Sequence, residues 1–460
     1  MAGHRINCTG NSFCQLKLKE AAFLKELPGL IIYVNIQTMN PKIIALIVFV
    51  ISYLLFVFLP HKRTLVALGG SLLLVLTQTL SLKEAFLAVN WNVMGIFVGT
   101  LIIADVFMQS RVPAYIAEVI VDRAKSTVWA ILFICILSGF ISAFVENVAT
   151  VLIVAPIALA LAKKLKINPM NMMIAIAVSS NLQGTATLIG DPPSMLLGGF
   201  AKMNFGDFFF YHGKPSIFFA VELGALVSFF VLYFIFRKHK AKAQLIPVEK
   251  VKSWVPTILL VSLIVLLALS SFFDSGFTSL AGQLCMVFGI LALVWEKLVN
   301  KTSIISGFKG LDWDTTFFLM GIFIIVGAIS LTGWIQVLAN YLANLVGGNI
   351  FLGYTAIVFI SVILSAFIDN VPFLAAMLPV AMIMADKLQI NPSLFLFGLL
   401  IGASLGGNIT PIGASANIVA CGLLKKEGYS VKFKDFMKIG VPFTIAAVTA
   451  AYLFVWFVWR

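Results

Sequence analysis

The sequence predicts an all-α polytopic membrane protein built from two inverted repeats, and three observations support this fold class. Hydrophobic residues make up 61% of the chain and charged residues 11%, with a mean hydropathy of +1.04. Soluble domains carry about 25% charged residues, so a chain this apolar needs lipid as its main solvent. Apolar runs recur at the length of about 20 residues that crosses a hydrocarbon core. One long segment also recurs, without gaps, in the second half of the chain.

The apolar runs predict the spanning helices in order. Each is close to the length of a membrane span and is bounded by charged or turn-forming residues. We expect spans near residues 43–60, 64–80, 92–109, 172–200, 216–236, 254–273, 279–299, 315–332, 393–424 and 439–459.

Four of the apolar stretches are irregular. The spans 172–200 and 393–424 are interrupted by Gly, Pro, Asn and Thr, which predicts broken helices. The stretches 128–162 and 350–385 each contain an acid–Asn pair, which predicts re-entrant hairpins. A short amphipathic piece precedes each hairpin, at 112–124 and 334–346.

These elements give each half five crossings and one hairpin. An odd number of crossings inverts the second half relative to the first, and inverted repeats are typical of transporters. The loops then expected inside hold clustered cations, including Lys62 with Arg63 and the cations of the central linker, whereas the loops expected outside hold few. This asymmetry predicts a cytoplasmic central linker. Because the cations lie between apolar runs, the formal charge of +13 does not indicate a nucleic-acid partner.

The same layout divides the chain into four parts. Residues 1–38 are mixed and polar, and we expect an N-terminal extension, either upstream of a misassigned start or a tail. The first transport repeat covers 39–236, the cationic linker 237–253, and the second transport repeat 254–460.

The repeat itself is visible as a self-match. The segment SAFVENVATVLIVAPIALALAKKLKINP from Ser142 aligns with SAFIDNVPFLAAMLPVAMIMADKLQINP from Ser365, so that Glu146 pairs with Asp369. A shared pattern of acid, Asn, Pro and Gly over this length indicates an internal duplication. In the same register Asn147, Gly184, Thr187, Gly190 and Ser194 fall on Asn370, Gly407, Thr410, Gly413 and Asn417.

Each repeat therefore pairs a hairpin tip with a helix break. Irregular backbone at membrane depth is tolerated where it lines a cavity, and glycines permit close approach to a ligand. Freed carbonyls with Asn and Thr side chains suit a cation, whereas half-helix N-termini favour an anion. The candidate binding residues are Glu146, Asn147, Thr150, Gly184, Thr185, Thr187, Gly190, Asp191, Asp369, Asn370, Asn408, Thr410, Gly413, Ser415 and Asn417, with sodium as a candidate ion at Asn147 and Asn370.

Three carboxylates stand out in these motifs. A buried ionised carboxylate is costly unless it is paired or binds a cation, and such a residue in a membrane segment indicates function. We expect Glu146 and Asp369 to bind a coupling cation or to exchange protons, with Asp191 assisting; the alternative is that each only caps a helix. No Lys or Arg falls inside either motif. An anionic substrate, a neutral hydroxylated solute and a cation all remain compatible with the motifs.

At these motifs the chain resembles the ion transporter superfamily. This superfamily includes arsenite permeases, sodium/proton antiporters of the NhaD type, the pigmentation P protein and the divalent-anion/sodium symporters, with a citrate-transporter-like domain. GTATLIGDPPSMLL is similar to the signature Gly-Thr-Leu-Ile-Gly-x-Pro-Pro-Asn, and GGNITPIGASANIVACGLLKKEGYSVKFKDFMKIGVP resembles the P protein and arsenite permease branch. The resemblance covers residues 40–460. It implies an elevator motion and a homodimer.

Two departures from the pattern bear on the substrate. The dicarboxylate branch carries Ser-Asn-Thr at both tips, whereas this chain has Glu146-Asn147-Val148 and Asp369-Asn370-Val371. The Asn is kept and the hydroxyls are lost, which argues against a dicarboxylate/sodium mechanism and favours proton or sodium coupling at an acid. Ser194 stands where the signature has Asn.

These observations predict a secondary active transporter, not an enzyme. We expect it to move a small ion or ionisable solute, an oxyanion such as arsenite or a carboxylate, coupled to Na⁺ or H⁺ and without a cofactor. A sodium/proton antiporter, a passive channel and, more remotely, an intramembrane lipid-modifying enzyme are the alternatives. The expected partners are membrane lipid, the substrate, a second copy of the chain and, for an arsenite-type system, a separate ATPase subunit. The expected location is the plasma or inner membrane.

Overall fold

The computed structural model describes residues 40–238, 250–274, 276–300 and 304–460. The predicted N-terminal extension 1–38 and most of the linker 237–253 lie outside the described residues. The described chain is an all-α polytopic membrane fold, apart from one two-residue antiparallel pair of strands. Nine of the described helices are long and apolar enough to cross a membrane.

The first repeat comprises α3 to α12. Its elements are α3 (Pro41–Phe58), η1 (Pro60–Lys62), α4 (Arg63–Leu76), α5 (Leu82–Ala88), α6 (Trp91–Gln109), α7 (Val112–Arg123), α8 (Thr127–Ser142), α9 (Asn147–Leu165), α10 (Met170–Gly184), α11 (Pro192–Ala201), η2 (Gly206–Phe208), β1 (Phe210–Tyr211), β2 (Lys214–Pro215) and α12 (Ile217–Phe236).

The second repeat follows the same order. Its elements are α13 (Val255–Ser270), α14 (Leu280–Asn300), α15 (Ile304–Lys309), α16 (Trp313–Leu331), α17 (Trp334–Val346), α18 (Ile350–Ser365), α19 (Asn370–Lys387), α20 (Pro392–Gly406), η3 (Gly407–Ile409), α21 (Ser415–Lys426) and α22 (Phe433–Trp459).

The predicted irregular elements are present in both repeats. The hairpins are α8–α9 and α18–α19, and the broken helices are α10–α11 and α20–α21. The short helices α5 and α15 and the two strands were not predicted from the sequence. Helix α5 begins with a capping box, in which Ser81 accepts from the backbone N–H of Glu84 and the Glu84 carboxylate accepts from that of Ser81. Such a helix is too short to appear in a search for apolar spans.

A pair of tryptophans shows how closely the repeats match. The indole N–H of Trp91 donates to the carbonyl of Phe86 at 3.0 Å, and that of Trp313 donates to the carbonyl of Phe308 at 2.7 Å. Each tryptophan opens the helix that follows a short connecting helix. The duplication therefore extends to local geometry outside the segment in which the two sequences match.

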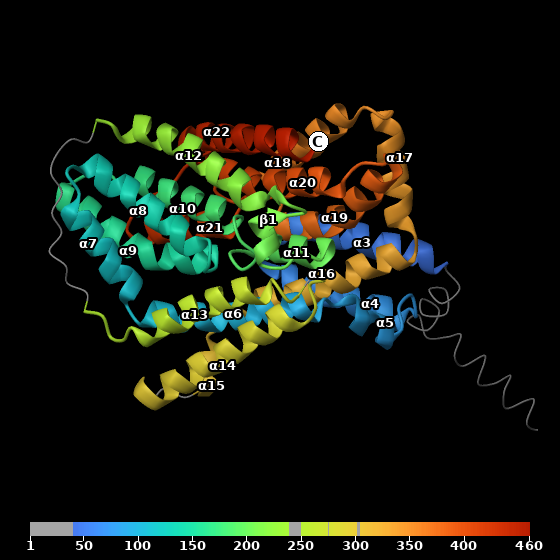
Figure 1. Ribbon diagram of the computed structural model, residues 1–460, viewed down its shortest axis with the longest axis horizontal. Helices are drawn as coiled ribbons and strands as arrows, with labels where there is room; N and C mark the ends of the chain where they lie inside the picture. Colours follow the sequence, from blue (N-terminus) through green and yellow to red (C-terminus); the bar gives the residue numbers. More distant parts are fainter. Residues whose placement is uncertain (1–39, 239–249, 275, 301–303) are drawn as a thin grey trace, which may run out of the picture.

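The helices form two groups. The frame helices are α3–α6 with α13–α16, in which α6 packs on α14 and α4 on α16. The core helices are α8–α12 with α18–α22, in which α10 and α20 lie at the centre and α12 packs on α22. Figure 1 shows α6, α13, α14 and α16 along one long side of the molecule and α12, α20 and α22 along the other. Helices α7 and α17 connect the groups within each repeat.

The two repeats enter the core from opposite ends. Helix α7 lies at one end of the long axis and α17 at the other, with α8–α9 toward the α7 end and α18–α19 toward the α17 end (Figure 1). This arrangement is the one that inverted repeats require. It brings the tips of the two hairpins toward one another inside the molecule.

Candidate functional site

Both hairpin tips and both helix breaks line one small polar cavity, the tip pocket. Its volume is about 150 Å³. The core helices supply most of its wall, and the frame helices α4, α6 and α16 close it. The lining residues are Arg63, Phe97, Glu146, Asn147, Val148, Asn181, Asp191, Pro192, Pro193, Asp312, Thr315, Asp369, Asn370, Val371, Ala414, Ser415 and Ala416.

Four helices of the core point their N-termini at the tip pocket, namely α9, α11, α19 and α21. Glu146 caps α9, because its Oε2 accepts from the N–H groups of Val148 at 2.9 Å and Ala149 at 3.1 Å. Asp191 caps α11 through Ser194, with N–H to Oδ1 at 3.1 Å. Exposed helix N-termini favour negative charge. The carboxylates of these two acids therefore offset part of the positive potential that the four N-termini create.

The other two N-termini differ from each other. Asp369 caps α19 through the N–H of Val371, which donates to Oδ1 at 3.1 Å, and its second carboxylate oxygen accepts from a side chain of the frame. Helix α21 has no side-chain cap, because Ala414 occupies the position that Asp191 holds in the first repeat. The second half-site therefore has one acid fewer at its helix break.

A chain of buried amides joins the two repeats. Asn147 accepts from the hydroxyl of Ser142 at 2.5 Å and donates to Oδ1 of Asn181 at 3.1 Å. Asn181 donates in turn to Oδ1 of Asn408 at 3.0 Å and to the carbonyl of Ser404 at 3.1 Å. Buried polar groups that are fully bonded rigidify a core, so this chain fixes the first tip against both broken helices.

The threonines of the breaks hold the tips in place. Thr187 donates to the carbonyl of Ala143, and Thr410 donates to the carbonyl of Ala366. Each acceptor lies just before the tip of the hairpin in the same repeat. These hydroxyls therefore face the backbone of the hairpin and do not line the tip pocket.

The glycines allow the break and the tip to touch. A Cβ on Gly184 would collide with Oδ1 of Asn147, and one on Gly190 would collide with the carbonyl oxygen of Gly184. In the second repeat a Cβ on Gly413 would lie 2.6 Å from the carbonyl oxygen of Gly407. Side chains at these positions would separate the two elements that build the pocket.

The predicted candidates thus fall into two sets. Glu146, Asn147, Asp191, Asp369, Asn370 and Ser415 line the tip pocket. The remaining candidates form the buried support behind it: Thr150, Gly184, Thr185, Thr187, Gly190, Asn408, Thr410, Gly413 and Asn417. Asn417 acts in this support by donating to the carbonyls of Gly407 and Thr410 at 3.0 and 2.9 Å.

The frame residues at the pocket, above all Arg63, were not among the candidates predicted from the sequence. Arg63 was expected in a cationic inside loop, but it is the first residue of α4. Its Nη1 lies 2.5 Å from Oδ2 of Asp369, and its Nη2 donates to Thr315 at 3.0 Å. A cation at a helix N-terminus is disfavoured by the helix dipole. An arginine at this position is therefore the feature of the sequence that could have indicated acceptor partners on other helices.

The charge of the tip pocket is strongly unequal. Glu146, Asp191, Asp312 and Asp369 contribute four carboxylates, and Arg63 is the one cationic side chain among the lining residues. A solute that enters this pocket meets an acidic wall, one guanidinium and four helix N-termini. The arrangement can hold a small cation, or an anion together with cations or protons.

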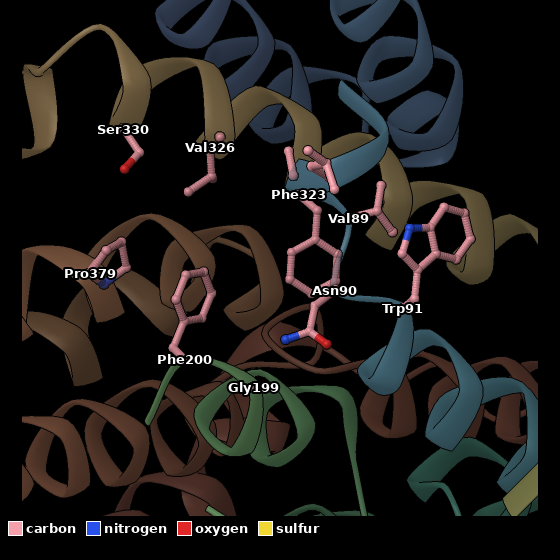
Figure 2. A pocket seen from close by; sticks show the side chains of 12 residues that line it. Val89, Asn90, Trp91, Gly199, Phe200, Phe323, Val326, Ser330 and Pro379 are labelled. Atoms are coloured by element: carbon pink, nitrogen blue, oxygen red, sulfur yellow. The ribbon is translucent and has the colours of Figure 1, made fainter. Parts of the chain in front are cut away.

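A larger cavity of about 480 Å³ lies elsewhere between frame and core. Figure 2 shows it between Val89, Asn90 and Trp91, the side chains of Phe323 and Ser330 on α16, and Phe200 and Pro379 from the core. None of its lining residues is charged. It therefore offers no charged group to an ion, and the tip pocket, with its carboxylates and one guanidinium, is the better candidate site.

The fold and the tip pocket define a class of protein: a multi-pass integral membrane transporter. A family model described as citrate transporter, CitMHS, matches residues 53–296 and 273–460. The chain belongs to this citrate transporter family.

Curated relatives are similar over most of the chain. An uncharacterized transporter of Mycobacterium tuberculosis is 30% identical over 426 residues, which cover 90% of this chain and 98% of that protein. The P protein of Mus musculus is 26% identical over 483 residues, which cover 86% of this chain and 58% of the P protein. The resemblance to the ion transporter superfamily is confirmed by these matches.

A solved structure supports the fold. The YdaH transporter of Alcanivorax borkumensis aligns with a TM-score of 0.57 at 13% sequence identity, covering 80% of this chain and 84% of that one. At this identity the likeness concerns the fold alone.

Proposed function

We propose that this protein is a secondary active transporter that moves a small ionisable solute, an oxyanion such as arsenite or a carboxylate, coupled to protons or sodium. The observation that carries the proposal is the tip pocket, where Glu146, Asp191 and Asp369 meet four helix N-termini. Carboxylates provide the means to bind a cation or a proton, and helix N-termini favour an anion. A site with both properties suits coupled movement of the two.

The boundary between frame and core supports an elevator-type mechanism. Arg63, Phe97, Asp312 and Thr315 close the tip pocket from the frame, and the other lining residues belong to the core. Sliding of the core helices against the frame helices would separate these two walls without dismantling the tips. In this proposal α7 and α17 are the connecting arms, and the chain works as a homodimer.

The positions of these side chains in the pocket support the following proposed ion-binding roles. Glu146 and Asp369 bind the coupling cation or exchange protons, Asp191 assists, and Asn147 and Asn370 are sodium ligands. We place the protein in the plasma or inner membrane with the central linker in the cytoplasm, as the clustered loop cations favour. For an arsenite-type substrate, a separate ATPase subunit would be a partner.

A sodium/proton antiporter is the second candidate. The excess of carboxylates over cations at the tip pocket favours it, because a desolvated acidic site prefers a cation. In that case sodium and protons would compete for the same carboxylates. No organic or oxyanionic substrate would then be required for exchange.

Flux measurements in proteoliposomes test both candidates. Purified protein would be given a proton or sodium gradient of either direction, and both uptake and efflux of citrate, succinate, arsenite and sodium would be followed separately. We expect accumulation of a solute against its own gradient. Downhill movement alone would indicate a channel and would contradict the proposal.

Two variants with matched controls locate the coupling. We expect Glu146→Gln and Asp369→Asn to abolish gradient-driven accumulation while the protein stays folded in the membrane. Glu427→Gln and Asp386→Asn make the same chemical changes at exposed positions and should behave as wild type. Wild-type accumulation by both tip variants would exclude the proposed roles of the two acids.

A further inference from the structure

The tip pocket adjoins a second cavity, the outer cleft, at one ion pair. The outer cleft has a volume of about 490 Å³ and is lined by residues that include His61, Asp314 and Ile412. It shares Arg63, Asp369, Ala414 and Ser415 with the tip pocket. The Arg63–Asp369 pair therefore stands where the two cavities meet.

The frame holds the guanidinium of Arg63 independently of Asp369. Its Nη2 donates to Oγ1 of Thr315 at 3.0 Å, and its Nε lies 3.6 Å from a carboxylate oxygen of Asp314. The ring of Phe318 lies 4.8 Å from the guanidinium carbon. Thr315 is itself fixed, because its hydroxyl donates to Asp312 at 2.6 Å. Loss of Asp369 would leave the guanidinium in place with Nη1 free.

The second hairpin tip differs from the first in the use of its acid. Oε2 of Glu146 accepts from two backbone N–H groups of α9. Asp369 accepts from one N–H of α19 through Oδ1 and presents Oδ2 to Nη1 of Arg63. Compared with Glu146, Asp369 therefore makes one contact fewer with its own helix and has a contact with the frame in its place.

One feature beside Arg63, a helix N-terminus, favours an anion. The uncapped N-terminus of α21 begins at Ser415, which lines both cavities with Arg63. The equivalent helix in the first repeat has its N-terminus capped by Asp191. A guanidinium beside an uncapped helix N-terminus provides planar donors and a positive field, which suit carboxylates and oxyanions.

We propose that Arg63 is the residue that recognises an anionic substrate, and that an ionised Asp369 occupies Arg63 and blocks this binding. A proton or a sodium ion that neutralises the Asp369 carboxylate would free Arg63 for the anion. The inference rests on the proposed function and deepens it by assigning the coupling to a change of hydrogen-bond partner at Nη1 of Arg63. A carboxylate or oxyanion oxygen replaces Oδ2 of Asp369 at Nη1. Because an ionised Asp369 competes for the same N–H group, the anion binds well only together with the cation.

Other charged groups face this pair, and a test must separate them. Asp312 and Asp314 approach from α16, Glu146 from the first tip, Asp191 from the start of α11, and His61 from η1. The variant His61→Gln therefore belongs in the experiment alongside the changes in Asp369.

Anion binding to the purified full-length protein provides the test. Apparent affinities for citrate, succinate and phosphate would be measured by thermal shift at pH 5.5 and pH 8, with and without sodium. We expect the wild type to bind its preferred anion at least about tenfold more weakly at pH 8 without sodium. Asp369→Asn should bind it tightly under all four conditions. The charge of the anion itself changes with pH in the same way for the wild type and for Asp369→Asn. The ratio of the two affinities at each pH therefore reports on Asp369. His61→Gln should show the same dependence of affinity on pH and sodium as the wild type.

The arginine is tested by a graded series. Arg63→Gln and the double variant Arg63→Gln/Asp369→Asn should lose at least about tenfold in anion affinity. Arg63→Lys should recover part of it, because a lysine keeps the charge without the planar fork. Lys62→Gln, an exposed neighbour, should match wild type. The double variant removes both members of the Arg63–Asp369 pair, and its melting temperature without anion, measured alongside, separates lost affinity from misfolding.

The outcomes distinguish this inference from the proposed function. Absence of anion binding by Asp369→Asn, or wild-type affinity in Arg63→Gln, would overturn the role of Arg63 even if gradient-driven flux is present. The expected binding pattern without any gradient-driven flux would uphold Arg63 as an anion site and count against the proposed function alone.

Discussion

The side-chain amide of Asn181 donates to Oδ1 of Asn408 at 3.0 Å and thereby ties the broken helix of the first repeat to that of the second. Asn408 returns a bond of 3.2 Å to the carbonyl of Val178. Both asparagines are buried. The reciprocal contact fixes the two helix breaks relative to each other, and through Asn147 it also fixes the first hairpin tip.

This contact predicts a clear effect of truncation. Asn181→Ala would leave Asn147, Asn408 and the carbonyl of Ser404 without their shared partner, and an unsatisfied buried polar group costs about 1–3 kcal/mol. We expect the melting temperature of the variant in detergent, measured by tryptophan fluorescence, to be lower than that of the wild type. Asn344→Ala, at an exposed position, should change it little. Equal melting temperatures for the two variants would contradict a structural role of the amide chain.

The contact between Gly184 and Asn147 predicts a second effect. In Gly184→Ala the added methyl group must push Asn147 away from the break, and such overpacking costs about 1–3 kcal/mol. Transport should fall together with the melting temperature, because Asn147 lines the tip pocket.

Gly422 offers the matched control for this change. It lies within α21, and nothing is found within 4 Å of the position that a Cβ would take. Gly422→Ala should therefore stabilise the protein by up to about 1 kcal/mol through helix propensity. A destabilised Gly422→Ala with an unaffected Gly184→Ala would refute the packing argument.

The loop that follows α11 predicts a pH dependence of stability. Asp207 accepts from the N–H of Asn204 at 2.8 Å, and the side chain of Asn204 donates to the carbonyl of Asp274 at 2.8 Å. Burial raises the pKa of Asp207 above its ordinary value, and the bond from Asn204 opposes part of that rise. The folded state therefore holds the proton more tightly than the unfolded state. This contribution to stability is full below the unfolded pKa and is lost as pH rises through the folded pKa.

Melting curves of wild type and Asp207→Asn between pH 4 and pH 7 check this prediction. An asparagine can keep the acceptor for Asn204 and does not ionise. The melting temperature of the wild type, relative to the variant, should fall as the pH rises. A difference that stays constant across the range would show that Asp207 does not titrate in the expected direction.

The sequence by itself determined the class of fold and the parts of the site that are local. The length of apolar runs predicts where helices cross, and a gap-free repeat predicts paired tips and breaks, because both signals reside in neighbouring residues. Glu146 and Asp369 were recognisable as tip acids for the same reason. The helix α5 was not predicted because its seven residues are too few for an apolar span.

Only the tertiary structure decided which side chains meet. Arg63 and Asp369 are 306 positions apart, and Asn181 and Asn408 are 227 apart. Such contacts depend on how the frame and core helices pack together. The local hydrophobic periodicity of the sequence carries no information about that packing. The structure also turned Thr187 and Thr410 toward the hairpin backbone and brought an arginine to a site whose own motifs contain none. Composition and periodicity specify the elements, whereas packing across hundreds of residues specifies the charge of the pocket.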